Sequence, residues 1–332
     1  MKKKLLCAVL ASALILCAAC KTNTNESAVS DASQASTAAQ ESSVSAESPI
    51  VTEDRAGNAI TVPEEINHIV SLAPSTTQVL IELGLADKIV AVDTYSAGYA
   101  DMLPAGIPQF DLMDPDCEAI IALDPDIIFT TGMSSVGGAN PFTPLVEAGY
   151  CVADIPTSES LDAIRDDIKF IGACTGEYEG ALELVDYMDS TLELAKDTCE
   201  GKTVLFLMSI PDASYPSVYT FGSNTYMQEM LDIIGATNVF ADQEGWISVS
   251  SEDCVAADPD VILTTVNWVE DPVADILAIE GWENVTAIVN GAVYYVDADL
   301  CSRPNEHIAD AVVEWAECIS SADSSSDSDE AA

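Results

Sequence analysis

The longest regular pattern of apolar and polar residues lies between Thr175 and Gly201, near the middle of the chain. Apolar residues recur there at spacings of three and four, with acidic residues between them, which is typical of an amphipathic helix. Thr175 is of the type that caps the start of a helix, and Gly201 of the type that ends one. About 22 helical residues at 1.5 Å each would span about 33 Å. We therefore predict one stiff bridging helix over residues 175–201.

Two related segments flank this predicted helix. Residues 116–131 read DCEAIIALDPDIIFTT and residues 250–265 read SSEDCVAADPDVILTT, with eight of 16 positions identical at a constant offset of 134. In each copy a capped helix stops at Asp-Pro, and a wholly apolar run follows, which suits a parallel strand covered on both faces. The repeat predicts an α/β fold of two Rossmann-like lobes with central, mostly parallel sheets, joined by one long bridging α-helix.

The same patterns divide the rest of the folded chain into an N-terminal lobe, residues 50–174, and a C-terminal lobe, residues 202–320. The N-terminal lobe opens with two alternating runs around a Gly-Asn turn, which predict a hairpin over residues 50–63. Buried strands are predicted over residues 69–73, 89–92, 126–130, 151–155, 203–208, 261–264 and 293–296. Helices are predicted over residues 78–83, 142–148, 226–234 and 308–319.

The first 19 residues combine a basic start with an apolar run that is too short to span a membrane, as in a secretory signal peptide. The run ends in Leu-Cys-Ala-Ala-Cys, which resembles a bacterial lipobox and implies lipidation of Cys20 after cleavage. A plain signal peptide with a chance cysteine is the alternative. Residues 20–49 hold almost no large apolar residue and predict the lipidated cysteine followed by a disordered tether. Residues 321–332 predict an acidic disordered tail.

The charge balance excludes one class of partner. The chain has 332 residues and a formal net charge of −45, from 56 acidic and 11 basic residues. Nucleic acid is excluded because phosphate binding needs a basic surface, and the negative field disfavours strongly anionic ligands.

Catalytic and metal motifs are also missing from the sequence. Two histidines do not supply a multi-histidine zinc site, and no nucleophile elbow or phosphate-binding glycine loop is found. We expect no enzyme activity, no catalytic residue, no metal site and no cofactor. Seven cysteines remain after processing, an odd number that rules out complete internal pairing, and we expect them to be structural.

Four segments together resemble a known family: Asp54–Pro63, His68–Thr77, Glu118–Ile128 and Gly281–Tyr295. With the lipobox, their order and spacing are similar to the helical-hinge (class III) substrate-binding lipoproteins of ABC importers for ferric siderophores, haem and cobalamin. The resemblance extends over nearly all of the chain from Ile50 to Ile319.

The resemblance implies a ligand cleft between the lobes, lined by the turns that follow the strand ends, where open α/β sheets bind ligands generally. The matching residues are Pro74, Ser75, Thr76, Tyr95, Met133, Ser134, Gly222, Ser223, Asn224, Trp246, Asn267, Trp268 and Arg303. For Tyr95 and Trp246 ordinary packing is the alternative. For Ser75 and Thr76 the alternative is helix N-capping.

Glu118 and Glu252 occupy matching places in the internal repeat, near the first turn of each predicted helix. In the family that the chain resembles, one such glutamate in each lobe docks to arginines of the permease, an arrangement that steers encounter and fixes orientation. The alternative is that each carboxylate complements its helix dipole.

The resulting expectation is a monomeric, extracytoplasmic lipoprotein, anchored to the cell membrane through Cys20. It would capture a corrinoid or ferric-siderophore-type chelate and deliver it to an ABC importer permease dimer with its ATPase. The scarcity of cations favours a corrinoid or a ferric hydroxamate over a catecholate, and Trp246 and Tyr95 favour the corrinoid. A haem-binding lipoprotein, a non-transport extracellular enzyme on the same fold and a surface adhesion protein are the alternatives.

Overall fold

The computed structural model describes residues 48–135, 138, 140–212 and 214–326. The predicted signal peptide, the lipidated Cys20, the tether up to residue 47 and the last six residues of the predicted tail lie outside the described residues. Within the described part, no helix is long and apolar enough to cross a membrane.

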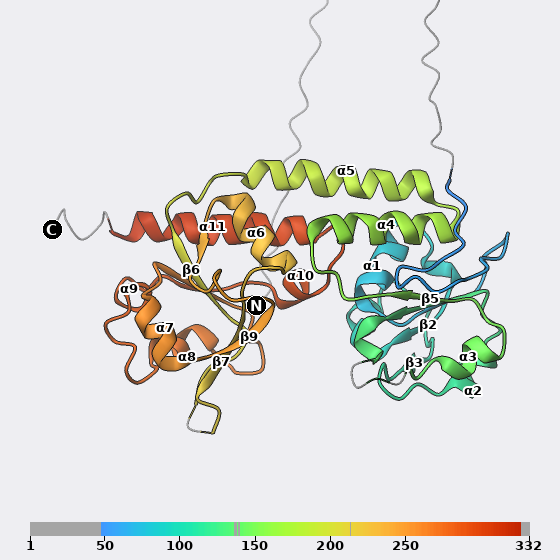
Figure 1. Ribbon diagram of the computed structural model, residues 1–332, viewed down its shortest axis with the longest axis horizontal. Helices are drawn as coiled ribbons and strands as arrows, with labels where there is room; N and C mark the ends of the chain where they lie inside the picture. Colours follow the sequence, from blue (N-terminus) through green and yellow to red (C-terminus); the bar gives the residue numbers. More distant parts are fainter. Residues whose placement is uncertain (1–47, 136–137, 139, 213, 327–332) are drawn as a thin grey trace, which may run out of the picture. The chain divides into compact units, whose positions relative to one another are not determined.

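The N-terminal lobe is built on a five-stranded sheet in which every pair is parallel, in the order β3-β2-β1-β4-β5. Its strands are β1 (Ile69–Ser71), β2 (Ile89–Asp93), β3 (Gln109–Phe110), β4 (Ile127–Thr131) and β5 (Val152–Ile155). Helices α1 (Pro74–Glu82) and α4 (Leu161–Thr175) lie on one face, and α2 (Cys117–Ile121) and α3 (Thr143–Glu147) on the other (Figure 1). Because both faces are covered, the central strands are buried and mostly apolar, with polar residues at their carboxyl ends.

The C-terminal lobe carries a four-stranded parallel sheet in the order β11-β10-β6-β8. Its strands are β6 (Thr203–Leu207), β8 (Thr237–Asn238), β10 (Val261–Thr264) and β11 (Val293–Tyr295), and β7 (Ser217–Phe221) pairs with β9 (Trp246–Ser250) as an antiparallel ribbon. The helices are α6 (Tyr226–Ile234), α7 (Ser251–Ala257), α8 (Pro272–Leu277), α9 (Thr286–Val289), α10 (Ala298–Ser302) and α11 (Ile308–Ser326). The predicted fold class is confirmed, whereas the β7–β9 ribbon was not predicted.

The bridging element is α5 (Tyr178–Ala195), which lies along α4 of the first lobe and along α11 of the second (Figure 1). Its inner face buries Ala181, Val185, Met188, Leu192 and Ala195. One continuous helix therefore packs against both lobes.

The predicted bounds of the bridging helix are wrong at both ends. Thr175 does not cap α5, because it is the last residue of α4 and its hydroxyl donates to the Ile171 carbonyl. Gly176 then adopts a left-handed conformation with φ of 79°, which ends α4. At the other end α5 stops at Ala195, six residues before Gly201.

The predicted hairpin over residues 50–63 is present as a short antiparallel pairing, in which Glu53 bridges to Ala59 and the Ile60 amide donates to the Thr52 carbonyl at 3.0 Å. The Asp54 side chain also accepts hydrogen bonds from the Asn58 amide and from the Asp154 backbone amide of β5. Short strand pairing and a buried carboxylate together fix this segment.

The predicted start of the tail at residue 321 is also wrong, since α11 continues to Ser326. Ala322 still packs against the core, so burial supports the helix beyond the predicted boundary.

The Asp-Pro-Asp units of the internal repeat have the same structural role in both lobes. Asp124 and Asp258 both adopt left-handed backbone conformations, with φ of 49° and 43°. Asp126 then accepts from the backbone amides of residues 67 and 68 before β1, and Asp260 accepts from the amide and hydroxyl of Thr203 in β6. The repeated sequence thus turns the chain out of a helix and ties the next strand to its neighbour in each lobe.

Candidate functional site

The carboxyl ends of the parallel strands hold most of the predicted ligand-binding residues. In the first lobe, β1 leads into Pro74, β2 into Tyr95 and β4 into Met133. In the second, β10 leads into Asn267 and Trp268. Because the carboxyl ends of parallel strands share one edge of a sheet, each lobe presents these turns together.

Tyr95 is the most prominent of these residues in the first lobe, with 67% of its surface exposed. Its backbone amide donates to the Asp93 carboxylate at 2.7 Å, and the Ser96 hydroxyl donates to the same carboxylate. Burial raises the pKa of Asp93, although these hydrogen bonds oppose the rise. The exposed phenol thus projects from a rigid, buried polar turn.

The buried hydrogen-bond network below Tyr95 extends into α1. There the Thr77 hydroxyl lies 2.8 Å from the Ser71 hydroxyl and 3.1 Å from the Ser96 hydroxyl. Sequence reasoning missed Asp93, Ser96, Thr77 and Ser71. The available signal was an aspartate directly after the apolar strand run Ile-Val-Ala-Val.

Pro74, Ser75 and Thr76 form the first turn of α1, and Thr76 is buried. The residue at the N-cap is Ala73, which makes no side-chain capping bond. The alternative that Ser75 or Thr76 caps this helix is therefore wrong.

Met133 and Ser134 lie in the short 3-10 turn after β4, and they differ in exposure. The Met133 side chain is exposed. Ser134 is buried, and its hydroxyl has no hydrogen-bond partner among the described residues.

In the second lobe, Gly222, Ser223 and Asn224 connect β7 to α6. A Cβ on Gly222 would overlap the Gln243 carbonyl, so this backbone contact requires glycine. The Ser223 hydroxyl donates to the same carbonyl at 2.9 Å. Packing thus accounts for the residue types at 222 and 223, while Asn224 is exposed with φ of 60°.

Trp246 and Trp268 are exposed aromatic residues of the second lobe, at 37% and 67%. The Trp246 ring contacts Phe221 and Tyr226 edge-on, with centroids 6.3 and 5.9 Å apart, so packing fixes its orientation. Asn267, next to Trp268, is also exposed.

Arg303 connects the two lobes. Its guanidinium lies 5.0 Å from the centre of the Tyr99 ring, donates to the Tyr95 carbonyl at 3.5 Å and pairs with Asp299 at 2.8 Å. Beside it, the Asn305 amide donates to Gln78 at 3.0 Å. The structure therefore brings together Arg303 and Tyr95, two predicted site residues that are 208 positions apart.

A family model described as periplasmic binding protein matches residues 69–300, which is more than half of the chain. The chain belongs to the periplasmic binding protein family. The family resemblance inferred from the sequence is confirmed.

Individual relatives agree with this assignment. The chain is 33% identical over 285 residues to the uncharacterised ABC transporter substrate-binding lipoprotein YvrC of Bacillus subtilis, covering 82% of this chain and 85% of YvrC. It is 26% identical over 283 residues to the cobalamin-binding protein of Halobacterium salinarum, covering 81% and 73%. A solved structure of a possible iron-binding, periplasmic solute-binding protein of Staphylococcus epidermidis superposes with a TM-score of 0.68 at 29% identity, covering 77% and 99%.

Two pockets in the described part of this periplasmic binding protein lie away from the strand ends. One of about 460 Å³ is lined by residues 49–55 and by α4, and one of about 340 Å³ lies among α4, α5 and α6. Neither is lined by a predicted ligand-binding residue. The ligand cleft between the lobes stays a prediction.

The two predicted docking residues of this binding protein occupy equivalent positions. Glu118 and Glu252 are each the second residue of a helix, α2 and α7, whose N-cap residues Asp116 and Ser250 bond to the third helical residue. Both glutamates are exposed, and their carboxylates bond to no other described residue. They are available for a partner, and docking stays a prediction.

Proposed function

We propose that this protein is an extracytoplasmic solute-binding lipoprotein, anchored through Cys20, that delivers a metal chelate to an ABC importer. The ligand class is a neutral or weakly charged chelate of the corrinoid or ferric-hydroxamate type. One observation carries the proposal: exposed aromatic side chains stand at a strand-end turn of each lobe, namely Tyr95 and Trp268, and at the start of β9, namely Trp246.

Exposed aromatic residues of this kind suit a large, partly apolar ligand. Tyr and Trp offer wide contact area with few rotatable bonds and a polar tip. Tyr95 and Trp246 are also held in place, one by its hydrogen-bonded turn and the other by ring contacts. Pre-organised side chains lose less conformational entropy on binding. A corrinoid, with its broad ring and many amides, matches such a surface.

The charge distribution favours a ligand without strong negative charge. Arg303, directly after α10, is the described cation that contacts the Tyr95 turn, and it is already paired with Asp299. Arg165, Lys169 and Lys196 lie instead on α4 or directly after α5, each paired with a carboxylate. A catecholate chelate would need a basic surface to offset its charge. The relative named as a cobalamin-binding protein supports the corrinoid choice.

Haem is a second candidate, and a specific observation favours it. Tyr95 and Met133 are both exposed at strand-end turns of the first lobe. Phenolate and thioether are both side-chain groups that ligate haem iron.

Tryptophan fluorescence separates these candidates. Of the four tryptophans, Trp282 and Trp315 are fully buried, so only Trp246 and Trp268 are open to direct contact with a ligand at the proposed site. We expect saturable quenching by cyanocobalamin or a ferric hydroxamate, and weaker affinity in the same titration when both exposed tryptophans are changed to Phe. N-acetyltryptophanamide controls for absorption by the ligand.

Each other outcome of this titration has a definite meaning. Saturable quenching by haem alone would favour the second candidate. Quenching by a ferric catecholate alone would contradict the charge argument. No saturable quenching by any of these four ligands would refute the proposed ligand class.

A further inference from the structure

A cluster of three metal-binding side chains lies beside the bridging helix. Glu82 is the last residue of α1 in the first lobe, and Glu306 and His307 directly precede α11 in the second. One oxygen of each carboxylate and one ring nitrogen of His307 all lie within 4.8 Å of one another. His307 Nε2 is 3.5 Å from Glu306 Oε1 and 3.6 Å from Glu82 Oε1. The cluster thus joins residues of both lobes.

Glu306 is the unusual member of this cluster. Its residue is 1% exposed, and neither carboxylate oxygen has a hydrogen-bond partner among the described residues. A buried ionised carboxylate without hydrogen bonds is costly unless a cation compensates it. The structure therefore contains a buried acceptor that faces His307 and lacks a hydrogen-bond donor.

His307 is oriented as a ligand histidine would be. Its Nδ1 lies 2.6 Å from Asp310 Oδ2, and Asp310 in turn accepts from the Tyr187 hydroxyl at 2.7 Å. An ionised carboxylate only accepts hydrogen bonds, so Nδ1 carries the proton. With a metal ion in place of the Nε2 proton, the ring would direct the lone pair of Nε2 toward Glu82 and Glu306. A carboxylate behind the histidine is the usual arrangement around protein-bound zinc.

We propose that Glu82, Glu306 and His307 bind a divalent transition-metal ion of the Zn²⁺ type, with Asp310 as a positioning residue. Two ligands about 2.05 Å from a tetrahedral zinc are roughly 3.4 Å apart, close to the measured 3.5 and 3.6 Å. One nitrogen and two carboxylate oxygens suit Zn²⁺ better than Ca²⁺ or Mg²⁺, which prefer oxygen ligands alone. The bound ion would hold α1 and the start of α11 together next to α5. This site is independent of the ligand proposed above.

The two histidines give the test an internal control. His68 is exposed, and its ring contacts the Asp124 carbonyl away from the cluster. In long-range ¹H–¹⁵N spectra of the metal-stripped protein, one equivalent of Zn²⁺ should shift the resonance of His307 Nε2. The ring resonances of His68 should not change. Calorimetry should show one tight site above the weak binding of an acidic surface.

Substitutions at each proposed ligand test which residues bind the metal ion. Glu306→Gln keeps the shape of the side chain and should abolish the tight step, and Glu82→Gln, at a more exposed position, should weaken it. Asp310→Asn should weaken Zn²⁺ binding about 10–100-fold. Glu280→Gln, an exposed glutamate outside the cluster, should have no effect. If Zn²⁺ leaves the His307 ring unshifted, or Glu306→Gln binds it as tightly as the parent, the cluster is a proton-sharing group and the metal site is refuted.

Discussion

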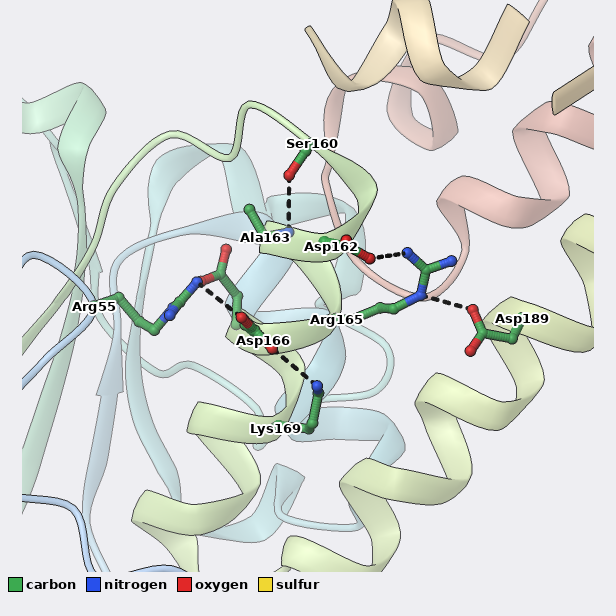
Figure 2. Close-up of polar contacts among 9 residues, drawn as sticks. Arg55, Ser160, Asp162, Ala163, Arg165, Asp166, Lys169 and Asp189 are labelled. Carbon is green, nitrogen blue, oxygen red and sulfur yellow. Dashed lines mark hydrogen bonds and ion pairs between the residues drawn. The ribbon is translucent and has the colours of Figure 1, made fainter. Parts of the chain in front are cut away.

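Two arginines at α4, Arg55 and Arg165, show how burial decides what an ion pair contributes to stability (Figure 2). Arg55 Nε donates to Asp167 at 2.6 Å, and this carboxylate is 11% exposed and also accepts from the Ser158 hydroxyl. Arg165 contacts Asp162 and Asp189, which are both largely in solvent. The first contact neutralises a buried carboxylate, whereas the two carboxylates that contact Arg165 are about half or more exposed.

We expect Arg55→Ala to cost about 3 kcal/mol of unfolding free energy, because it leaves the Asp167 carboxylate buried without its cation. Arg165→Ala, the matched control, should cost at most about 1 kcal/mol. Urea unfolding at neutral pH measures both. Equal losses for the two variants would show that burial does not distinguish them.

The pH dependence of the stability lost in Arg55→Ala follows from the direction in which the pKa of Asp167 is shifted. Burial raises the pKa of Asp167, and the hydrogen bonds from Arg55 and Ser158 oppose the rise. A carboxyl whose folded pKa is raised contributes stability that is present below its unfolded pKa and is lost as pH rises through the folded pKa. Removing Arg55 raises the folded pKa further. The loss caused by Arg55→Ala should therefore be larger at pH 7 than at pH 4, and equal losses would contradict this account.

At the scale of elements, the junction of α4 and α5 depends on a close helix contact that the periodicity does not reveal. A Cβ on Gly172 would overlap the Ala181 side chain and lie 2.9 Å from the Glu177 carbonyl oxygen. Only glycine lets α4 and α5 meet so closely at this turn. The prediction started the bridging helix at Thr175 because this residue type caps helices, whereas in the structure Thr175 ends α4.

Gly172→Ala should therefore lower the unfolding free energy by roughly 1–3 kcal/mol through overpacking, although alanine favours helices. Gly180→Ala is the matched control in α5. Its new methyl would lie 3.1 Å from Leu83 Cδ2, the end of a flexible side chain. That variant should be neutral or stabilising by up to about 1 kcal/mol. Urea or thermal unfolding compares them, and a loss at 180 as large as at 172 would contradict the packing argument.

Elements with strong local signals could be predicted from the sequence, and those that depend on distant partners could not. The helix at residues 226–234 and the strand at 261–264 have the predicted bounds, because a glycine stop or an apolar run defines them. The β7–β9 ribbon forms only because two segments about 30 residues apart pair with each other. Its alternating, half-exposed residues give a weaker signal than a buried strand.

At the scale of the whole molecule, the parts of the candidate site that lie beside a predicted strand could be proposed from the sequence, and the contacts between the lobes could not. The turns after apolar strands are visible in the sequence, and the family resemblance implies that such turns line the ligand cleft, so Tyr95 and Trp268 could be proposed as site residues. The contacts between the lobes, Arg303 with Tyr95 and Asn305 with Gln78, join residues more than 200 positions apart. Nothing local in the sequence specifies such pairs.

The proposed docking to a permease would involve both lobes together. Glu118 and Glu252 lie at equivalent helix starts, one in each lobe, and neither carboxylate is engaged by the described part of the protein. A partner with two matching cations would be oriented by both at once. Such contacts act on the complex with the permease and leave the ligand site untouched.

We expect Glu118→Ala combined with Glu252→Ala to reduce uptake of the bound ligand at least roughly tenfold, with unchanged tryptophan quenching. Glu147→Ala combined with Glu280→Ala is the control, since it removes one exposed carboxylate from each lobe and the same total charge. Radiolabelled uptake in cells that carry the cognate importer measures both pairs. If the control pair lowers uptake equally, net charge governs the encounter. If neither pair lowers it, the two glutamates are not the docking residues, and their carboxylates serve only the helix starts on which they lie.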